Sequence, residues 1–317
     1  MSILLLGADG QVGFELHRAL APLTPIVATT RKGVLPGGSA CTRCDLDDDE
    51  GLRALIASTR PRWIVTAAAY TAVDRAEDEP ELAQRINGSA LGVISAAAKQ
   101  IDARVVHFST DYVFNGQSTR PWREDDATAP LGAYGRSKLA GEIALRESGA
   151  AHLILRTAWV YGARGTNFLR TMLRLARERD RLTIVADQTG TPTSARLIAD
   201  TTALLLHTLR DAAVTDPRFG TYHLTASGHT TWHGFASRII DHAHTGGLIE
   251  RKPDVAAITS AEFPTKAQRP AYSVLDTHKL QSTFGLTLPD WSEGLARVMG
   301  DCRGAELTEP GTTAPAT

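Results

Sequence analysis

The sequence predicts a doubly wound α/β fold, in which a parallel sheet is covered by helices on both faces. Three observations carry this prediction. Short apolar runs alternate with stretches of helical period through the first half of the chain, a glycine-rich segment joins the first run to the first helix, and the alternation loosens after about residue 160. The 317 residues are enough for such a domain and a smaller second lobe.

The predicted strands are buried apolar runs at residues 3–6, 26–28, 63–65, 105–108 and 153–155. Between them, apolar side chains recur at helical spacing. A first stripe contains Val12, Leu16, Ala19 and Leu20, and a second contains Leu82, Ile86, Val93, Ile94 and Ala97. We therefore predict a dinucleotide-binding domain over residues 1–160.

Beyond residue 160 we expect mainly a substrate-binding lobe, 161–303, that covers the open edge of the sheet, although some segments could return to the first domain. Its predicted elements are helices near 168–178, 194–209 and 232–244, strands at 182–185 and near 222–224, and a proline-punctuated stretch at 253–270. Residues 304–317, rich in Thr, Pro, Ala and Gly, are predicted to be a disordered tail.

Charge and hydropathy exclude several classes of protein. Lys and Arg number 34 against 35 Asp and Glu, so the chain lacks the basic character of a nucleic-acid-binding domain. No apolar run approaches the roughly 18 residues that span a bilayer, so we expect a cytoplasmic protein without a membrane partner. Cys41 and Cys44 form a C-x-x-C pair without a second ligand pair, so no metal site is predicted.

The glycine-rich segment has the spacing G-x-x-G-x-x-G, with Gly7, Gly10 and Gly13 around Gln11 and Val12. Glycines here let the backbone turn sharply and approach a pyrophosphate, while the N-terminus of the following helix offers N–H groups to the anion. A plain tight turn is the alternative. The position between a strand and an amphipathic helix favours dinucleotide binding.

The residues after the second strand bear on the choice of dinucleotide. NAD binding would place an acid there, but the chain has Arg31 and Lys32, and no acid occurs before Asp45. Arg31 suits the 2′-phosphate of NADPH, because a guanidinium offers a planar fork of donors. NADPH is the predicted cofactor; NADH, with Arg31 and Lys32 in a solvated turn, is the alternative.

Tyr134 and Lys138 are four residues apart and so lie on one face of a predicted helix. A free phenol has a pKa of about 10, and a nearby cation is expected to lower it. Thr110 directly follows the 105–108 strand, at the sheet edge where open α/β sheets bind ligands. Taken alone, the Tyr–Lys pair would be an ordinary surface helix; with Thr110 it predicts proton transfer to a carbonyl oxygen.

These segments together resemble the dTDP-4-dehydrorhamnose reductase family of extended short-chain dehydrogenases/reductases. The matching residues span about 1–280: they are 7–13, 67–74, 109–114, 134–142 and 155–162, with Gln188, Gly190, Pro192, Thr193, Arg269 and Pro270. The resemblance implies NAD(P)H-dependent reduction of the 4-keto group of a nucleotide-linked 6-deoxyhexose. dTDP-4-dehydrorhamnose is the first expectation for the substrate, and a related deoxysugar of secondary metabolism is the second.

The resemblance also implies roles for individual residues. Thr110, Tyr134 and Lys138 would polarise and protonate the carbonyl oxygen, Lys138 and Tyr134 also contacting the cofactor. Trp159, with Asp111 and Tyr112 beside Thr110, would contact the sugar. Ala67, Ala68 and Ala69 would approach the cofactor, with Asp45 and Leu46 beside its adenine. The family usually carries Asn where this chain has Thr66, which alters the local hydrogen bonding. A homodimer is expected by analogy alone.

Two other readings of the same motifs are less favoured. A nucleotide-sugar dehydratase or epimerase shares the fold, but dehydratases typically follow the catalytic Thr with an Asp-Glu pair, and here Asp111 precedes Tyr112. A non-catalytic regulator similar to the methionine adenosyltransferase regulatory subunit would not need Thr110, Tyr134 and Lys138 together. Their presence favours an enzyme.

Overall fold

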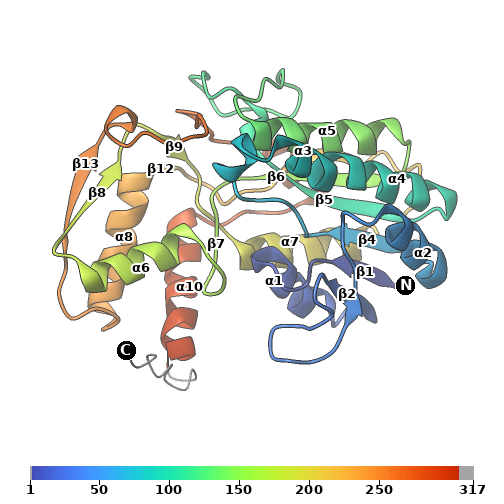
Figure 1. Ribbon diagram of the computed structural model, residues 1–317, viewed down its shortest axis with the longest axis horizontal. Coiled ribbons are helices and arrows are strands. Elements are labelled where there is room, and N and C mark those ends of the chain that lie inside the picture. Colours follow the sequence, from blue (N-terminus) through green and yellow to red (C-terminus); the bar gives the residue numbers. More distant parts are fainter. Residues whose placement is uncertain (1, 307–317) are drawn as a thin grey trace.

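The computed structural model describes residues 2–306. Its centre is a seven-stranded sheet of order β11-β6-β5-β4-β1-β2-β3, in which every neighbouring pair is parallel (Figure 1). The strands are β1 (Ile3–Leu6), β2 (Ile26–Thr30), β3 (Thr42–Arg43), β4 (Trp63–Thr66), β5 (Arg104–Thr110), β6 (His152–Thr157) and β11 (Gly220–His223). The predicted doubly wound α/β fold is confirmed.

Helices cover both faces of this sheet (Figure 1). One face carries α1 (Gln11–Leu20), α7 (Ala195–Thr208) and α9 (His278–Phe284), and the other carries α2 (Asp49–Thr59), α4 (Ala90–Gln100) and α5 (Ala133–Glu147). Because both faces are covered, all the residues of β1 and β4 are buried. This explains why these strands are continuous apolar runs.

The predicted helical stripe between residues 82 and 97 is a composite helix. It consists of α3 (Pro80–Gln84), a π-helical turn η2 (Arg85–Ser89) and α4. Short 3-10 turns occur at η1 (Arg75–Glu77), η3 (Asp111–Val113) and η4 (Ser260–Glu262). Of these, η3 directly continues β5, so it carries the chain past the carboxyl end of the sheet.

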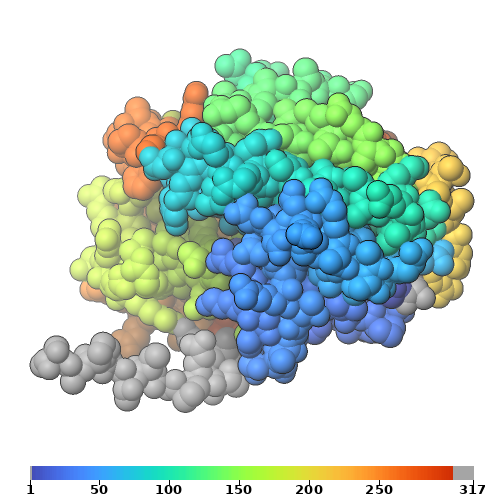
Figure 2. Space-filling model, turned by 45° about the vertical axis from the view of Figure 1, so that its right-hand side comes forward, coloured from blue at the N-terminus to red at the C-terminus, as the bar shows by residue number. Residues whose placement is uncertain are grey.

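The second lobe has its own apolar core. It contains α6 (Phe168–Glu178), α8 (Trp232–Thr245), α10 (Trp291–Glu306) and the parallel pair β8 (Arg181–Val185) and β13 (Asp254–Ile258), with short strands β7 (Val160–Tyr161), β9 (Thr189–Gly190), β10 (Thr193–Ser194) and β12 (Thr230–Thr231). In Figure 2 part of this lobe, coloured yellow-green, lies directly against the blue N-terminal segments.

The structure differs from the sequence-based expectations in three places. The second lobe was expected to cover the open edge of the sheet, but β11 forms that edge by pairing with β6. Helix α7, also from beyond residue 160, packs on α1 of the first domain. The proline-punctuated stretch 253–270 contains β13, which pairs with β8. Residues 304–306 continue α10 where a disordered tail was expected, and 307–317 lie outside the described residues. The division at residue 160 stays a prediction.

None of the helices within residues 2–306 is both long and apolar enough to cross a membrane. Nor does this part of the chain gather three or more His, Cys, Asp or Glu side chains that could hold a metal ion.

Candidate active site

A cavity of about 610 Å³ opens at the carboxyl ends of β1, β2, β4, β5 and β6, between the sheet and the second lobe. This edge, where the strand order reverses between β1 and β4, is where doubly wound sheets bind ligands. The cavity is lined by nearly all the predicted site residues: Gly7, Gly10, Gln11, Val12, Arg31, Asp45, Leu46, Ala67, Ala68, Ala69, Thr110, Asp111, Tyr112, Tyr134, Lys138 and Trp159. Gly13 is the predicted site residue that is not among the lining residues.

The glycine-rich segment forms a tight bend between β1 and α1. Gly7 has a φ of +86°, which favours glycine, and its N–H donates to the Thr29 carbonyl. A Cβ at Gly13 would lie 1.9 Å from the Gly7 oxygen, so only glycine permits this approach of helix to strand. The first N–H groups of α1 thereby open onto the cavity, as a pyrophosphate site requires.

The wall next to this bend is the segment that follows β4. The N–H groups of Ala67 and Ala68 both donate to the Leu6 carbonyl, at 2.9 Å each, so the chain leaving β4 crosses the end of β1. The small side chains of the alanines add little bulk to this segment where it crosses the end of β1. The three alanines line the cavity with side chains of one methyl group each, so a ligand can come close to the backbone of this segment.

Arg31 lies just beyond β2, on the same stretch of cavity wall as Asp45 and Leu46, and is exposed. Arg31→Ala is expected to weaken NADPH binding about 10-fold or more and leave NADH binding unchanged, because a hydrogen-bonded charge pair contributes about 1.5–3 kcal/mol. The dissociation constants of both nucleotides, measured by fluorescence titration, check this. Lys32→Ala, also exposed but outside the cavity lining, is the control. Equal losses for NADPH and NADH would contradict the assignment.

Helix α5 is held unusually close to the segment after β5. A Cβ at Gly135 would lie 2.3 Å from the Tyr112 carbonyl oxygen, so glycine is required for this approach. The hydroxyl of Ser137 donates to the Tyr134 carbonyl at 2.8 Å and accepts from the Asn87 amide at 3.0 Å. The rings of Tyr134 and Tyr112 pack edge to face, 5.8 Å between centroids. These contacts fix Tyr134 against Thr110 and Tyr112.

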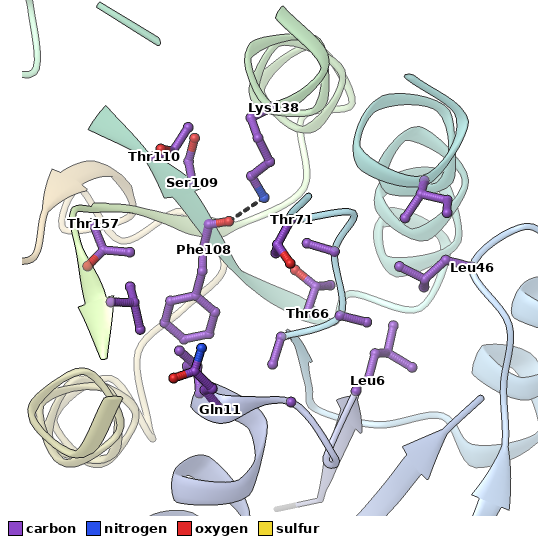
Figure 3. Close-up of a pocket in the computed structure, with 18 of the residues that line it drawn as sticks. Leu6, Gln11, Leu46, Thr66, Thr71, Phe108, Ser109, Thr110, Lys138 and Thr157 are labelled. Atoms are coloured by element: carbon purple, nitrogen blue, oxygen red, sulfur yellow. Dashed lines mark hydrogen bonds between the residues drawn. The ribbon is translucent and has the colours of Figure 1, made fainter. Parts of the chain in front are cut away.

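Thr110 ends β5 and caps η3, accepting the N–H of Tyr112 at 3.2 Å and donating to Asp111 Oδ1 at 3.0 Å. Lys138 projects from α5 toward the same end of the sheet, and Figure 3 shows its ammonium donating to the Phe108 carbonyl, at 2.5 Å. Thr110, Tyr134 and Lys138 all line the cavity. The structure thus brings together the three residues that the sequence predicted as a proton-transfer set.

The electrostatics of the pair differ from the expectation. Burial raises the pKa of Tyr134 to about 12, opposed in part by a hydrogen bond between Tyr134 and Thr110. Burial also lowers the pKa of Lys138 to about 8, while the charge of Glu142 raises it. The expected lowering of the Tyr134 pKa is therefore wrong for this geometry, because burial of the phenolate is the largest effect and the charge of Asp111 adds to it. A phenol that stays protonated at neutral pH can act as a proton donor.

Asp111 is a buried acid beside Thr110. Burial raises its pKa to about 7, against hydrogen bonds from Ser273 and Thr110 that lower it. Its Oδ2 is buried and has no hydrogen-bond partner among the described residues. The Asp111 carboxyl is therefore mostly neutral below about pH 7 and mostly ionised above it.

The raised pKa of Asp111 predicts a pH dependence of stability. An unfolded aspartate has a pKa of about 3.9, so the folded state binds an extra proton between about pH 4 and pH 7. Stability from this group is complete below about pH 4 and is lost as pH rises through about 7. The change in unfolding free energy caused by Asp111→Asn is therefore expected to be more favourable at pH 8 than at pH 5 by at least about 1 kcal/mol. Urea unfolding at both pH values checks this; an equal effect at both contradicts it.

On the lobe side, an aromatic pair forms the cavity wall. The rings of Trp159 and Trp232 are stacked, with centroids 3.5 Å apart and an interplanar angle of 4°. Trp159 has a φ of +47°, a left-handed conformation that is costly for a tryptophan. The stack holds the Trp159 ring in the cavity wall in spite of that cost, which suits contact with a flat or apolar face of a ligand.

Several cavity residues were missed by sequence reasoning. They are Leu6, Asp9, Thr29, Cys44, Thr71, Val73, Ile86, Phe108, Ser109, Thr157, Val160, Thr166 and Trp232. Most flank predicted residues along the same strands. Trp232 and Thr166 come from the second lobe, and Gln11 contacts the Thr166 carbonyl and Asn167 across the two parts of the fold. Thr66, which stands where the resembling family usually has Asn, forms a hydrogen bond between its Oγ1 and His107 Nδ1 at 2.8 Å.

Known proteins match this chain over nearly its whole length. A family model described as "RmlD substrate binding domain" matches residues 1–303. The dTDP-4-dehydrorhamnose reductase of Escherichia coli (strain K12) is 47% identical over 301 residues, covering 95% of this chain and 98% of that relative.

Solved structures agree. A dTDP-4-dehydrorhamnose reductase from Clostridium acetobutylicum superposes with a TM-score of 0.84 at 33% identity, covering 96% of this chain and 100% of that one. The one from Bacillus anthracis, in complex with NADP, has a TM-score of 0.82 at 32% identity, covering 95% and 99%. This chain belongs to the dTDP-4-dehydrorhamnose reductase family.

Proposed function

We propose that this protein uses NADPH to reduce the 4-keto group of dTDP-4-dehydrorhamnose, giving dTDP-rhamnose. The observation that carries the proposal is that Thr110, Tyr134 and Lys138 line the same cavity as the glycine-rich bend. Relatives that are 46–47% identical bear the name of this activity, and a structural neighbour is in complex with NADP. NADH is the alternative reductant.

The residues present fit a dinucleotide. Gly7 and Gly10 keep the bend free of side chains, and the N-terminus of α1 offers N–H groups to a diphosphate. Arg31 would hold a 2′-phosphate, Asp45 and Leu46 would flank the adenine, and Lys138 would donate to the nicotinamide ribose. When bound, NADPH supplies the hydride for the carbonyl carbon.

The proton is the protein's contribution. Tyr134 donates its phenolic proton to the carbonyl oxygen as negative charge develops there, and the ketone becomes a secondary alcohol. The Thr110 hydroxyl can rotate from Asp111 to the same oxygen and stabilise that charge with a second hydrogen bond. The stacked Trp159 would hold the sugar, with Asp111 and Tyr112 beside it.

The test is an assay of NADPH oxidation with a panel of nucleotide-linked 4-keto hexoses, repeated with NADH. The proposal expects turnover with dTDP-4-dehydrorhamnose and the dTDP-linked product. Loss of water or exchange of ring protons without reductant would instead indicate a dehydratase or epimerase, and dinucleotide binding without turnover on any sugar would indicate a regulatory subunit. A substrate from secondary metabolism, the homodimer and the cytoplasmic location remain predictions.

A further inference from the structure

His107 is a buried histidine that the mechanism above does not use. It lies in β5, one residue before Phe108, and only 3% of it is exposed. Both ring nitrogens have partners: Nε2 lies 3.1 Å from Lys138 Nζ, and Nδ1 lies 2.8 Å from Thr66 Oγ1. The imidazole thus bridges helix α5 and strand β4 through a catalytic lysine.

The protons of this chain of contacts can be assigned by elimination. A lysine ammonium has only donors, so Nε2 of His107 must accept and carries no proton. The ring proton is therefore on Nδ1 and is donated to Thr66 Oγ1. Thr66 can accept it because its own hydroxyl proton goes to the Val106 carbonyl, at 3.2 Å. Each group then makes a consistent set of hydrogen bonds that ends at a backbone oxygen.

A charged imidazole does not fit this position. Burial, followed by the charge of Lys138, holds the pKa of His107 well below its ordinary value. The charge that acts on His107 is that of Lys138, and the charge that acts on Lys138 is that of Glu142 on the same helix, while β4 places the neutral hydroxyl of Thr66 against the ring. His107 is the neutral acceptor in this surrounding.

We propose that His107 is a positioning residue for Lys138: as the Nδ1–H tautomer, fixed by Thr66, it accepts one N–H of the Lys138 ammonium and holds that ammonium in place at the cavity. The Phe108 carbonyl accepts a second N–H, so two of the three ammonium protons are held by β5. The third is left for a ligand in the cavity that Lys138 lines. The effect of His107 on turnover rests on the proposed function, whereas its hydrogen bond to Lys138 does not.

The tautomer can be measured in the unmodified protein without cofactor or substrate. In ¹⁵N-histidine-labelled protein, the His107 signals, assigned by their loss in His107→Gln, are expected to show a protonated Nδ1 and an unprotonated Nε2 between about pH 6 and pH 8. An Nε2–H tautomer, or a charged ring in that range, would overturn the proposal. This result does not depend on whether the protein is a reductase.

A matched pair of variants tests the effect on Lys138. The glutamine of His107→Gln can place its amide oxygen near the position of Nε2, whereas the shorter His107→Asn reaches only the position of Nδ1. A hydrogen bond to the charged form favours that form, so its loss should lower the Lys138 pKa. We expect a fall of about one pH unit in His107→Asn and a value near that of the wild type in His107→Gln, followed by the ¹³C resonance of the lysine side chain.

Activity gives the second readout. The kcat of His107→Asn is expected to fall about 10-fold or more. In the pH profile of kcat, the fall at alkaline pH is expected to move toward neutral pH by the same one unit. Both quantities should stay close to wild type in His107→Gln. Equal losses in both variants, with an unchanged Lys138 pKa, would mean that His107 only fills space and would overturn the proposal. If the pKa shifts as expected but neither the variants nor the wild type turn over a 4-keto sugar, the proposed function fails and the positioning role stands.

Discussion

Tyr134→Phe is expected to lower kcat by a factor of about 10²–10⁴, the usual contribution of a positioned general acid. The phenol is the proposed proton donor, and burial, which raises its pKa to about 12, keeps it protonated at neutral pH. Phenylalanine keeps the ring that packs edge to face on Tyr112. The variant should therefore fold and bind NADPH as the wild type does while losing turnover.

The measurement combines steady-state kinetics with an NADPH titration and a thermal melt. Tyr222→Phe is the control, because Tyr222 lies in β11, outside the cavity lining, and the change removes a hydroxyl that donates to the Arg218 carbonyl. That control is expected to alter stability slightly and kcat not at all. Near-normal turnover in Tyr134→Phe would require another proton donor, and the role of Tyr134 would have to be abandoned.

The sequence predicted those parts of the site in which the residues lie close together along the chain. Gly7, Gly10 and Gly13 follow a strand directly, and Tyr134 and Lys138 share one helix face, so short-range geometry already fixes their relation. Thr110 was found because it follows a buried run, and the carboxyl ends of parallel strands share one edge.

The residues that were missed depend on contacts between distant parts of the chain. Trp232 begins α8, far from Trp159 in sequence, and no local pattern shows that their rings stack. β13 lies in a proline-punctuated stretch and is a strand because it pairs with β8. The sign of the Tyr134 pKa shift depended on burial, which the Tyr–Lys spacing does not report.

A buried ion pair joins helix α5, which bears Tyr134 and Lys138, to strand β6, beside the β5 strand that ends at Thr110. Glu142 lies on α5, four residues after Lys138, with its side chain fully buried, and Arg156 of β6 donates to it through Nε at 2.9 Å and Nη2 at 2.7 Å. It also accepts from Ser109, the residue before Thr110, at 2.5 Å and from Arg146 at 3.0 Å. One carboxylate thus ties together α5, β5 and β6.

Glu142→Gln is expected to lower the free energy of unfolding by about 3–5 kcal/mol, because Arg156 would remain buried without a counter-charge. Urea unfolding at neutral pH measures this. Glu147→Gln removes the same charge from an exposed position of α5 and is expected to change stability by less than about 0.5 kcal/mol. If the two variants lose stability equally, the ion pair is not what aligns the helix.

The pH dependence of the unfolding free energy distinguishes loss of the Glu142 charge from a change in side-chain packing. Burial acts to raise the pKa of Glu142, but the hydrogen bonds and charge of Arg156, with Ser109 and Arg146, lower it overall. Its contribution is therefore present above the unfolded pKa of about 4.3 and disappears as pH falls through the lower folded value. The gap in unfolding free energy between wild type and Glu142→Gln should begin to narrow as pH falls below about 4, where unfolded Glu142 takes up its proton, and should be smallest below the folded pKa, where both proteins carry a neutral side chain. A gap that stays constant to low pH would mean that packing, and not charge, explains the loss.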